Sequence, residues 1–522
     1  MLGSLALRAL ALAASISLVF AAPAKKPKLV LAIVVDQFRY DYLLRFRADY
    51  SAGLSRLLAQ GAVFTDAHYP QAATITAVGH STFLTGATPS VSGIVGNEWW
   101  DRASETKVTS VSDPNTRIVG GFAGLEGASP NRLLVSTVGD ELKMREGENS
   151  RVIGISLKDR SAILPSGHMA DGAFWFDNAS GRWATSNYYM EALPDWVKAL
   201  NDTSPLRRHI GSQWFPLGTG DDSTAPLCTM VAGTDVRFCG SIEATPWANE
   251  MIEEMAERAL AAEHLGHHPG TDILTVSFSA NDYVGHEVGP DDPAVRDISI
   301  RTDRLLGKLF DAAENAAGAG NTLVVFTADH GVAQVPEVNR TRHMPGGRIT
   351  EAQITNAINE ALRKKFGPGD WVKPIPVWMP YLNLKLIEER NLDRAAVERA
   401  AADAVSSIPH VARVYTRTQL LNGAVQQDPV GRAVSVGYYG PRSGDLIVIP
   451  EPYYLFETMR ANHGAPYDYD NHVPVIFMGS GVKAGTYRER IAPNDIAPTL
   501  SEILGVERPS GATSRVLSEI LE

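Results

Sequence analysis

The chain has 522 residues, of which 44% are hydrophobic and 20% are charged, a composition that is typical of globular proteins and excludes an intrinsically disordered chain. Asp and Glu (59) outnumber Lys and Arg (48), which gives a formal net charge of −11. This balance argues against a general nucleic-acid-binding protein, which needs a basic face, so an anionic substrate would need positive charge from a few local side chains or metal ions.

The first 22 residues predict a secretory signal peptide. Arg8 precedes an apolar run over 9–20, and the small residues Ala21 and Ala22 follow it. A basic start, a short apolar centre and a small-residue cleavage site are typical of export. The alternative is a membrane anchor, but the run is shorter than the roughly 20 apolar residues that a span needs. We therefore expect a periplasmic or secreted protein with no membrane span after cleavage.

Buried strands and helices alternate along the rest of the chain. Four apolar runs rich in β-branched residues are continuous, which predicts strands buried on both faces, at 28–35, 151–157, 272–278 and 322–327. Helical patterns are found at 54–60, 77–84, 247–263, 295–316 and 495–504. This alternation predicts an α/β fold in which helices sandwich a mostly parallel central sheet.

Two stretches interrupt the alternation and divide the core into three parts, 27–164, 246–364 and 451–522. Residues 165–245 are rich in Trp, Tyr, Gly and Pro and predict a loop-rich surface insertion, whereas residues 365–450 predict a small α+β cap subdomain. Cys228 and Cys239, the only cysteines, lie in the insertion. In an oxidising compartment this pair predicts a disulfide, with two unrelated buried thiols as the alternative.

Carboxylate and imidazole side chains gather where a parallel sheet forms its sites, beyond the carboxyl ends of the predicted strands and in later loops. The set is Asp36, Asp282, His286, Asp329, His330 and His463. Asp282 and His286 are four residues apart, so a helical turn would place them on one face. Taken singly, each residue is better explained as a cap, a turn or a loop residue than as a ligand. Together, mixed nitrogen and oxygen ligands suit zinc, and six side chains suit two ions better than one.

Thr76 precedes the helix predicted at 77–84, where unpaired N–H groups favour an anion. A threonine hydroxyl needs a metal or a base to become a nucleophile, so on its own Thr76 is an ordinary helix cap. His80, four residues later, is expected to be structural.

Lys158 and Arg160 follow the strand predicted at 151–157. In an extended segment both would point to one face, with Asp159 opposite. An ammonium beside a guanidinium suits a phosphoryl group, and the alternative is a solvated charged turn.

Seven segments resemble the alkaline phosphatase superfamily, whose members transfer phosphoryl and sulfuryl groups with two zinc ions. They are VVDQFRYDYL (34–43), TITAVGHSTFLTG (74–86), GIVGN (93–97), SLKDRSAILPSGH (156–168), SANDYVGHEVGP (279–290), TADHG (327–331) and NHGAPYDYDNHVP (462–474). Within the superfamily the chain is most similar to secreted bacterial alkaline phosphatases of the phosphate-irrepressible type, which use a threonine nucleophile. These are related to nucleotide pyrophosphatases and phosphodiesterases.

The resemblance implies a role for each position. One metal would be held by Asp36, Asp329, His330 and the nucleophile Thr76, and the second metal by Asp282, His286 and His463. Phosphoryl oxygens would be bound by Asn97, Lys158 and Arg160. His472 competes with His463, since both lie in one motif, but His463 belongs to the His-Gly element shared with the diesterase relatives.

The resemblance also implies the reaction. Diesterase relatives share the ligands but accommodate a second ester group where monoesterases place positive charge, so Lys158 and Arg160 favour a phosphate monoester. We expect two Zn²⁺ per chain, a covalent phosphothreonine intermediate, small phosphate monoesters as substrates, no binding of nucleic-acid polymers, and a monomer. A phosphodiesterase or nucleotide pyrophosphatase is the alternative, and a further structural ion such as Ca²⁺ stays open. A sulfatase is disfavoured because no C/S-x-P-x-R element is present, and a degenerate, non-catalytic scaffold would have to lack one of these residues.

Overall fold

The computed structural model describes residues 26–124, 126–217, 225–231, 240–374, 378–456 and 458–522. The predicted signal peptide and Cys239 lie outside these ranges, so export and the disulfide stay predictions. Within them, no helix has both the length and the apolar character that crossing a membrane requires.

A mixed sheet of 11 strands forms the centre of the described chain. Its strands, in order across the sheet, are β19 (Gly485–Tyr487), β2 (Ala62–Phe64), β18 (Val475–Gly479), β13 (Thr322–Thr327), β1 (Leu29–Val35), β12 (Asp272–Phe278), β7 (Val152–Ser156), β8 (Gly172–Asp177), β9 (Arg182–Ser186), β5 (Ser112–Val119) and β6 (Glu126–Ala128). The five strands from β13 to β8 run parallel, and β18 and β9 flank them antiparallel. The four predicted strands are therefore four of the five parallel strands at the centre, and the predicted α/β fold is confirmed.

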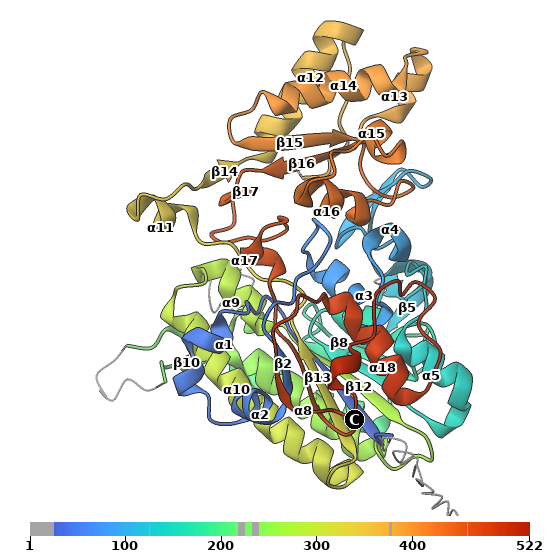
Figure 1. The fold of residues 1–522 in the computed structure, drawn as a ribbon, viewed down its shortest axis with the longest axis vertical. Coiled ribbons are helices and arrows are strands. Elements are labelled where there is room, and N and C mark those ends of the chain that lie inside the picture. Colours follow the sequence, from blue (N-terminus) through green and yellow to red (C-terminus); the bar gives the residue numbers. More distant parts are fainter. Residues whose placement is uncertain (1–25, 125, 218–224, 232–239, 375–377, 457) are drawn as a thin grey trace, which may run out of the picture.

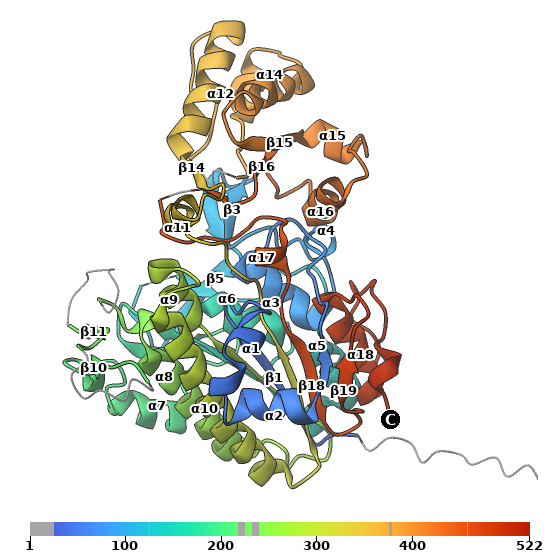
Figure 2. The same ribbon diagram turned by 60° about the vertical axis from the view of Figure 1, so that its left-hand side comes forward.

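Helices cover both faces of this sheet, as Figures 1 and 2 show. Alternate residues of β1 point to opposite faces of the sheet and belong to two different apolar clusters. Leu31 and Ile33 lie in the cluster formed with a first set of helices, and Val30 and Ala32 lie in the cluster formed with a second set. The first set is α2 (Gly53–Gln60), α8 (Pro246–Ala262) and α10 (Pro293–Ala317). The second set is α3 (Thr76–Thr85), α5 (Val138–Glu146) and α18 (Ile496–Leu504). Burial on both faces explains why the strands carry unbroken apolar runs.

The range 165–245 differs from the loop-rich surface insertion that its composition predicts. It begins with β8 and β9, two strands of the main sheet in which Phe174, Phe176 and Trp183 are buried. A strand covered on both faces can be built from aromatic residues, and averaging composition over the whole range hides such a short run. The residues after β9 form short elements, which include α7 (Asp195–Asp202), β10 (Gln213–Trp214) and β11 (Cys228–Thr229).

A separate layer stands above the carboxyl edge of the sheet, at the top of Figure 1. Helices α12 (Glu351–Phe366) and α14 (Arg394–Ser406) pack on the antiparallel pair β15 (Val411–Thr416) and β16 (Leu446–Pro450) around an apolar cluster of their own. Strands β14 (Gly347–Ile349) and β17 (Tyr454–Phe456) pair in parallel where the chain enters and leaves this layer. We call this layer, residues 347–456, the cap; it starts before the predicted boundary at residue 365, because α12 begins at Glu351 and spans that boundary.

Candidate active site

Three neighbouring strands end at the same edge of the sheet, and a carboxylate follows each of them. Asp36 follows β1 directly, Asp329 follows soon after β13, and Asp282 lies in α9 (Ala280–Val288), which begins just beyond β12. Because β1 pairs with both β12 and β13, these three side chains come together.

Two histidines join Asp282 to form what we call the Asp282 cluster (Asp282, His286 and His463). The Nε2 atoms of His286 and His463 lie 3.1 and 3.8 Å from Oδ1 of Asp282. Asp282 and His286 face each other across one turn of α9, as their spacing predicts.

The second group, the Asp36 cluster (Asp36, Asp329 and His330), adjoins the first. Nε2 of His330 lies 3.5 Å from Oδ1 of Asp36 and 3.3 Å from Oδ2 of Asp329. The rings of His330 and His463 stack with their centroids 3.5 Å apart. The structure thus brings all six predicted ligand residues to one place.

Each of the three histidines is oriented by a backbone carbonyl. Nδ1 of His286, His330 and His463 donates to the carbonyl oxygens of Ala461, Gly331 and Thr74, at 2.8, 2.9 and 2.7 Å respectively. Because a carbonyl only accepts, Nδ1 must carry a proton, and in the neutral ring Nε2 then presents its lone pair to the clusters. This is the arrangement found for metal-ligating histidines.

Two carboxylate oxygens in the Asp36 cluster have no hydrogen-bond donor among the described residues, Oδ1 of Asp36 and Oδ2 of Asp329. Both side chains are buried, and a buried anionic oxygen without a partner is costly. A divalent cation would satisfy both oxygens, and the mixed nitrogen and oxygen donors fit zinc.

Burial and mutual repulsion govern the charges of the site. Burial, together with the carboxylates of Asp282 and Asp329, raises the pKa of Asp36 well above its usual value. Burial acts on Asp282 in the same direction, but the Lys158 ammonium and neighbouring imidazoles overcome it and hold the pKa of Asp282 well below its usual value. Burial, helped by the two other histidines, lowers the pKa of His463, which keeps this imidazole neutral and able to bind a metal.

Lys158 connects the two clusters. Its Nζ donates to Oδ2 of Asp36 at 2.7 Å and to Oδ2 of Asp282 at 2.6 Å. Lys158 has an extended backbone as the N-cap of α6 (Asp159–Ser166), but the predicted extended segment is wrong beyond it, since Arg160 lies in the first helical turn. The chain turns into the helix directly after β7, so strand alternation does not apply. Lys158 and Arg160 nevertheless line the same cavity, and Nε of Arg160 is buried without a hydrogen-bond partner.

Thr76 is the first residue of α3, where the helix N-terminus meets the Asp36 cluster. Its Oγ1 lies 3.4 Å from Nε2 of His330. Ile75, not Thr76, is the N-cap, and the side chain of Thr76 does not cap α3, so the ordinary-cap interpretation of Thr76 does not hold. Oδ1 of Asn97 accepts from the backbone N–H of Ala77 at 2.9 Å, which fixes Asn97 beside Thr76.

Helix α3 approaches Asp329 closely through Gly79. A Cβ atom at Gly79 would lie 2.3 Å from the carbonyl oxygen of Asp329 and 2.6 Å from its Cα. The next residue, His80, is fully buried; its Nδ1 lies 2.8 Å from the Thr76 carbonyl oxygen and 3.2 Å from Oδ2 of Asp329. Gly79 and His80 thereby set the distance between the helix and the Asp36 cluster.

Replacing Gly79 with alanine is expected to push α3 away from Asp329 and to lower the catalytic efficiency by about 10²-fold, since displacing a reacting group by roughly 1 Å has that effect. The melting temperature should also fall, because the clash is with backbone atoms. Gly437→Ala is the matched control: it lies in a helix, and its Cβ would meet nothing closer than 3.6 Å. Equal kcat/KM and equal melting temperatures for the two variants would contradict this role of Gly79.

A cavity of about 540 Å³ lies between the clusters and the cap. Its polar wall carries Thr76, Asn97, Lys158, Arg160, Asp282, His286 and His463. Its opposite wall is supplied by the cap residues Trp378, Tyr454 and Phe456. Trp99 is not part of the lining; it is buried beneath the guanidinium groups of Arg132 and Arg442.

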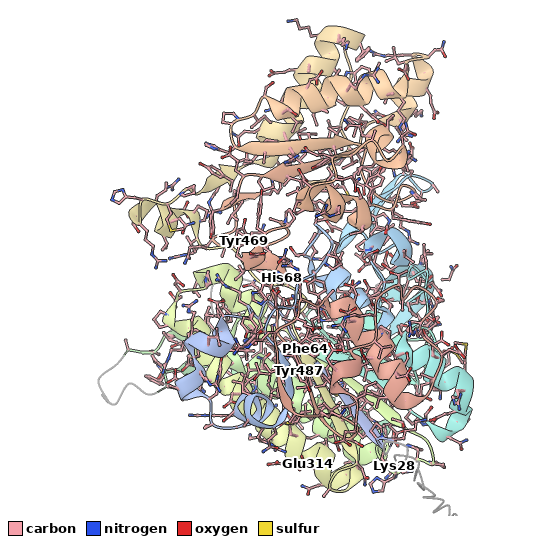
Figure 3. All side chains as sticks on the ribbon, in the orientation of Figure 1. Lys28, Phe64, His68, Glu314, Tyr469 and Tyr487 are labelled. Atoms are coloured by element: carbon pink, nitrogen blue, oxygen red, sulfur yellow. The ribbon has the colours of Figure 1, made fainter. Side chains whose placement is uncertain are left out.

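His472, the competing candidate ligand, lies away from Asp282. Its ring stacks between Tyr40 and His68, at 4.4 and 4.3 Å, and its Nε2 donates to the carbonyl oxygen of Thr65. Figure 3 labels His68, which lies near α17 (Asp468–Asn471). His68 and His472, together with Asp66, form a separate group of potential metal ligands outside the two clusters.

Asp470 lines the cavity, although it is not among the site residues that the sequence predicts. Its Oδ2 accepts from the N–H of Ala465 at 2.9 Å, while its Oδ1 is buried without a partner. Burial raises the pKa of Asp470 well above its usual value. Nothing in the sequence distinguishes it from Asp468, which is exposed.

Comparison with known proteins gives a family model for type I phosphodiesterase / nucleotide pyrophosphatase that matches residues 30–473. Alkaline phosphatase PafA of Elizabethkingia meningoseptica is 32% identical over 95% of both chains. A protein named calcium-transporting ATPase from Myroides odoratus is 34% identical over 95% of both chains. Alkaline phosphatase PhoV of Synechococcus elongatus is 33% identical over 97% of this chain and 94% of its own. A crystal structure of wild-type PafA aligns with a TM-score of 0.89, covering 95% of this chain and 99% of that one.

Proposed function

The chain belongs to the type I phosphodiesterase / nucleotide pyrophosphatase family, among relatives that include alkaline phosphatases, and from this premise we propose that it is an exported two-zinc alkaline phosphatase. One observation carries the proposal: the Asp36 and Asp282 clusters adjoin each other beside the Thr76 hydroxyl and the Lys158–Arg160 pair. Export is supported by the N-terminal signal pattern.

Each cluster would hold one zinc ion, with Thr76 completing the site of the Asp36 cluster. Zinc bound there would supply Lewis-acid stabilisation of the charge that develops on the attacking, leaving and phosphoryl oxygens.

Thr76 would act as the nucleophile. Its Oγ1 would release its proton to solvent and form a bond to phosphorus while the bond from phosphorus to the leaving-group oxygen breaks, and the leaving group would depart with the electron pair and take up a proton from solvent. Water then cleaves the phosphothreonine at the P–Oγ1 bond, which releases inorganic phosphate and restores the hydroxyl. The N-terminus of α3 favours the negative charge at this position.

Asn97, Lys158 and Arg160 would bind the phosphoryl oxygens. Lys158 would exchange its contacts with Asp36 and Asp282 for a phosphoryl oxygen once metal ions neutralise those carboxylates. Arg160 presents a buried N–H group that has no partner within the described chain. Two positive side chains suit the dianion of a small phosphate monoester better than a diester monoanion. Diester hydrolysis, after which the matching family model is named, is the second candidate.

Removing the metals is expected to abolish hydrolysis. After exhaustive chelation, the phosphate-release rate with an aryl phosphate should fall below about 1% of its original value, and about two zinc ions per chain should restore it. The chelated chain should keep its helical circular dichroism, since the apolar clusters do not depend on the ligands. Elemental analysis together with the rate tests this: full activity in a chain that holds no metal would contradict a metal-dependent reaction.

A further inference from the structure

Gln37, directly after Asp36, has an unusual backbone for its residue type. Its φ is +60°, in the left-handed region that glycine normally occupies. Among the described non-glycine residues with positive φ, Gln37 alone is buried, at 2% exposure. A long polar side chain held at a strained, buried position beside the Asp36 cluster indicates that the side chain has a functional role there.

The two ends of Gln37 donate to carboxylates of different clusters. Its backbone N–H donates to Oδ1 of Asp329 at 3.1 Å. Its side-chain Nε2 donates to Oδ1 of Asp282 at 2.6 Å, the same oxygen that faces Nε2 of His286. Since a carboxylate accepts, the amide nitrogen must be the group that points at Asp282.

Helix α9 is shaped to receive this amide. A Cβ atom at Gly285 would lie 1.8 Å from Oε1 of Gln37, and the next two nearest atoms are also atoms of the Gln37 amide. Gly285 stands between Asp282 and His286, in a helix interior where glycine is unfavourable. Two departures from local preference, a left-handed glutamine and a helical glycine, therefore meet at a single contact.

We propose that Gln37 is a positioning residue that holds the carboxylates of the two clusters in fixed positions relative to each other. Its backbone N–H orients Asp329, and its side-chain amide orients Asp282. The inference rests on the proposed function, because the orientation of these carboxylates matters when they bind metal. Its N–H and that of His330 both bind Oδ1 of Asp329, which turns Oδ2 toward the ring of His330. The side-chain amide likewise holds Asp282 in front of its histidines.

Three variants of the full-length protein separate hydrogen bonding from packing. Gln37→Gly relieves the left-handed strain and keeps the backbone N–H but removes the amide, and Gln37→Met keeps the length of the side chain without a donor. The double variant Gln37→Gly, Gly285→Ala refills the space with a methyl group but restores no donor. Circular dichroism establishes that each variant is folded, and if Gln37→Gly does not fold, Gln37→Met carries the test.

The readout is titration of the metal-free proteins with Zn²⁺ against a chromophoric chelator. We expect the wild type to bind two ions, and every variant to bind one of them 10- to 100-fold more weakly, the range that loss of a ligand-orienting partner produces, with the other affinity unchanged. In kcat, the variants should lose more with esters of weakly acidic phenols than with esters of acidic ones, because Asp282 belongs to the cluster that does not include the nucleophile Thr76, and an ion held there would stabilise the leaving-group oxygen. A purely structural role would lower both rates alike.

Wild-type zinc affinities in both Gln37→Gly and Gln37→Met would overturn the proposal, as would recovery of the wild-type affinities in the double variant, which would assign Gln37 to packing alone. If the proposed function itself is wrong, the measurements on the wild type would show it. In that case the wild type itself would bind no pair of zinc ions or hydrolyse no monoester, whatever the variants do.

Discussion

Thr76→Ala is expected to lower kcat/KM for an aryl phosphate monoester by on the order of 10⁴-fold or more, because the variant lacks the nucleophilic oxygen. The Thr76 hydroxyl lies 3.4 Å from Nε2 of His330 and caps no helix, so its loss should leave α3 and the metal clusters intact. The variant should retain about two zinc ions per chain, since six other side chains supply the ligands.

Thr76→Ser is the matched control for this prediction. It keeps a hydroxyl at the first position of α3, and its kcat/KM should stay within about tenfold of the wild type, because only the rotamer restriction of the β-methyl group is lost. If Thr76→Ala kept a tenth or more of the wild-type kcat/KM while retaining both metals, Thr76 could not be the nucleophile.

Arg160→Ala is the second change with a large expected effect. It should lower kcat/KM for a phosphate monoester by about 10²-fold, the scale of losing one donor to a developing charge, while a matched methyl diester changes only a few fold. The reason is electrostatic: the monoester carries a second negative charge, and the ion pair of Arg160 with Asp159, from Nη1 to Oδ1, is long at 3.7 Å. Initial rates with the ester pair measure both values.

Two further variants test whether this effect is specific. Arg160→Lys keeps the positive charge but lacks the planar guanidinium that can donate two parallel hydrogen bonds. It should therefore retain more monoesterase activity than Arg160→Ala but less than the wild type. Arg340→Ala removes an exposed arginine of α11 (Pro336–Thr341) that lies outside the cavity lining, and should change neither rate. Equal losses for monoester and diester in Arg160→Ala would contradict the selectivity assigned to Arg160.

The strands at the centre of the sheet could be predicted from the sequence because burial on both faces leaves an unbroken apolar run. Every residue of β1 and of β12 is buried, so neither strand has a solvent-facing side that would require alternating polar residues. Strands β8 and β9 were missed because their short aromatic runs lie within a stretch whose average composition is typical of loops. Periodicity alone also does not show whether a strand is followed by a loop or a helix, so the start of α6 at Asp159, which places Arg160 in a helical turn, could not be predicted.

The ligands of the two clusters could be proposed because carboxylates and imidazoles at strand ends form a recognisable chemical set. Their neighbours carry no such signal. The choice between His463 and His472 depends on a tertiary contact with Asp282, and Asp470 resembles any other loop carboxylate until its burial is known. The left-handed backbone of Gln37 likewise has no signature in sequence, since glycine is the residue that normally indicates it.

The most direct test of the central claim is the ratio of kcat/KM for an aryl phosphate monoester to that for its matched methyl diester, measured with the zinc-loaded protein. The positive charge of Lys158 and Arg160 beside Thr76 predicts a ratio well above one, and a rate that falls with Thr76→Ala for the monoester. A ratio below one, with the diester as the better substrate, would contradict the assignment as a phosphate monoesterase and favour a phosphodiesterase.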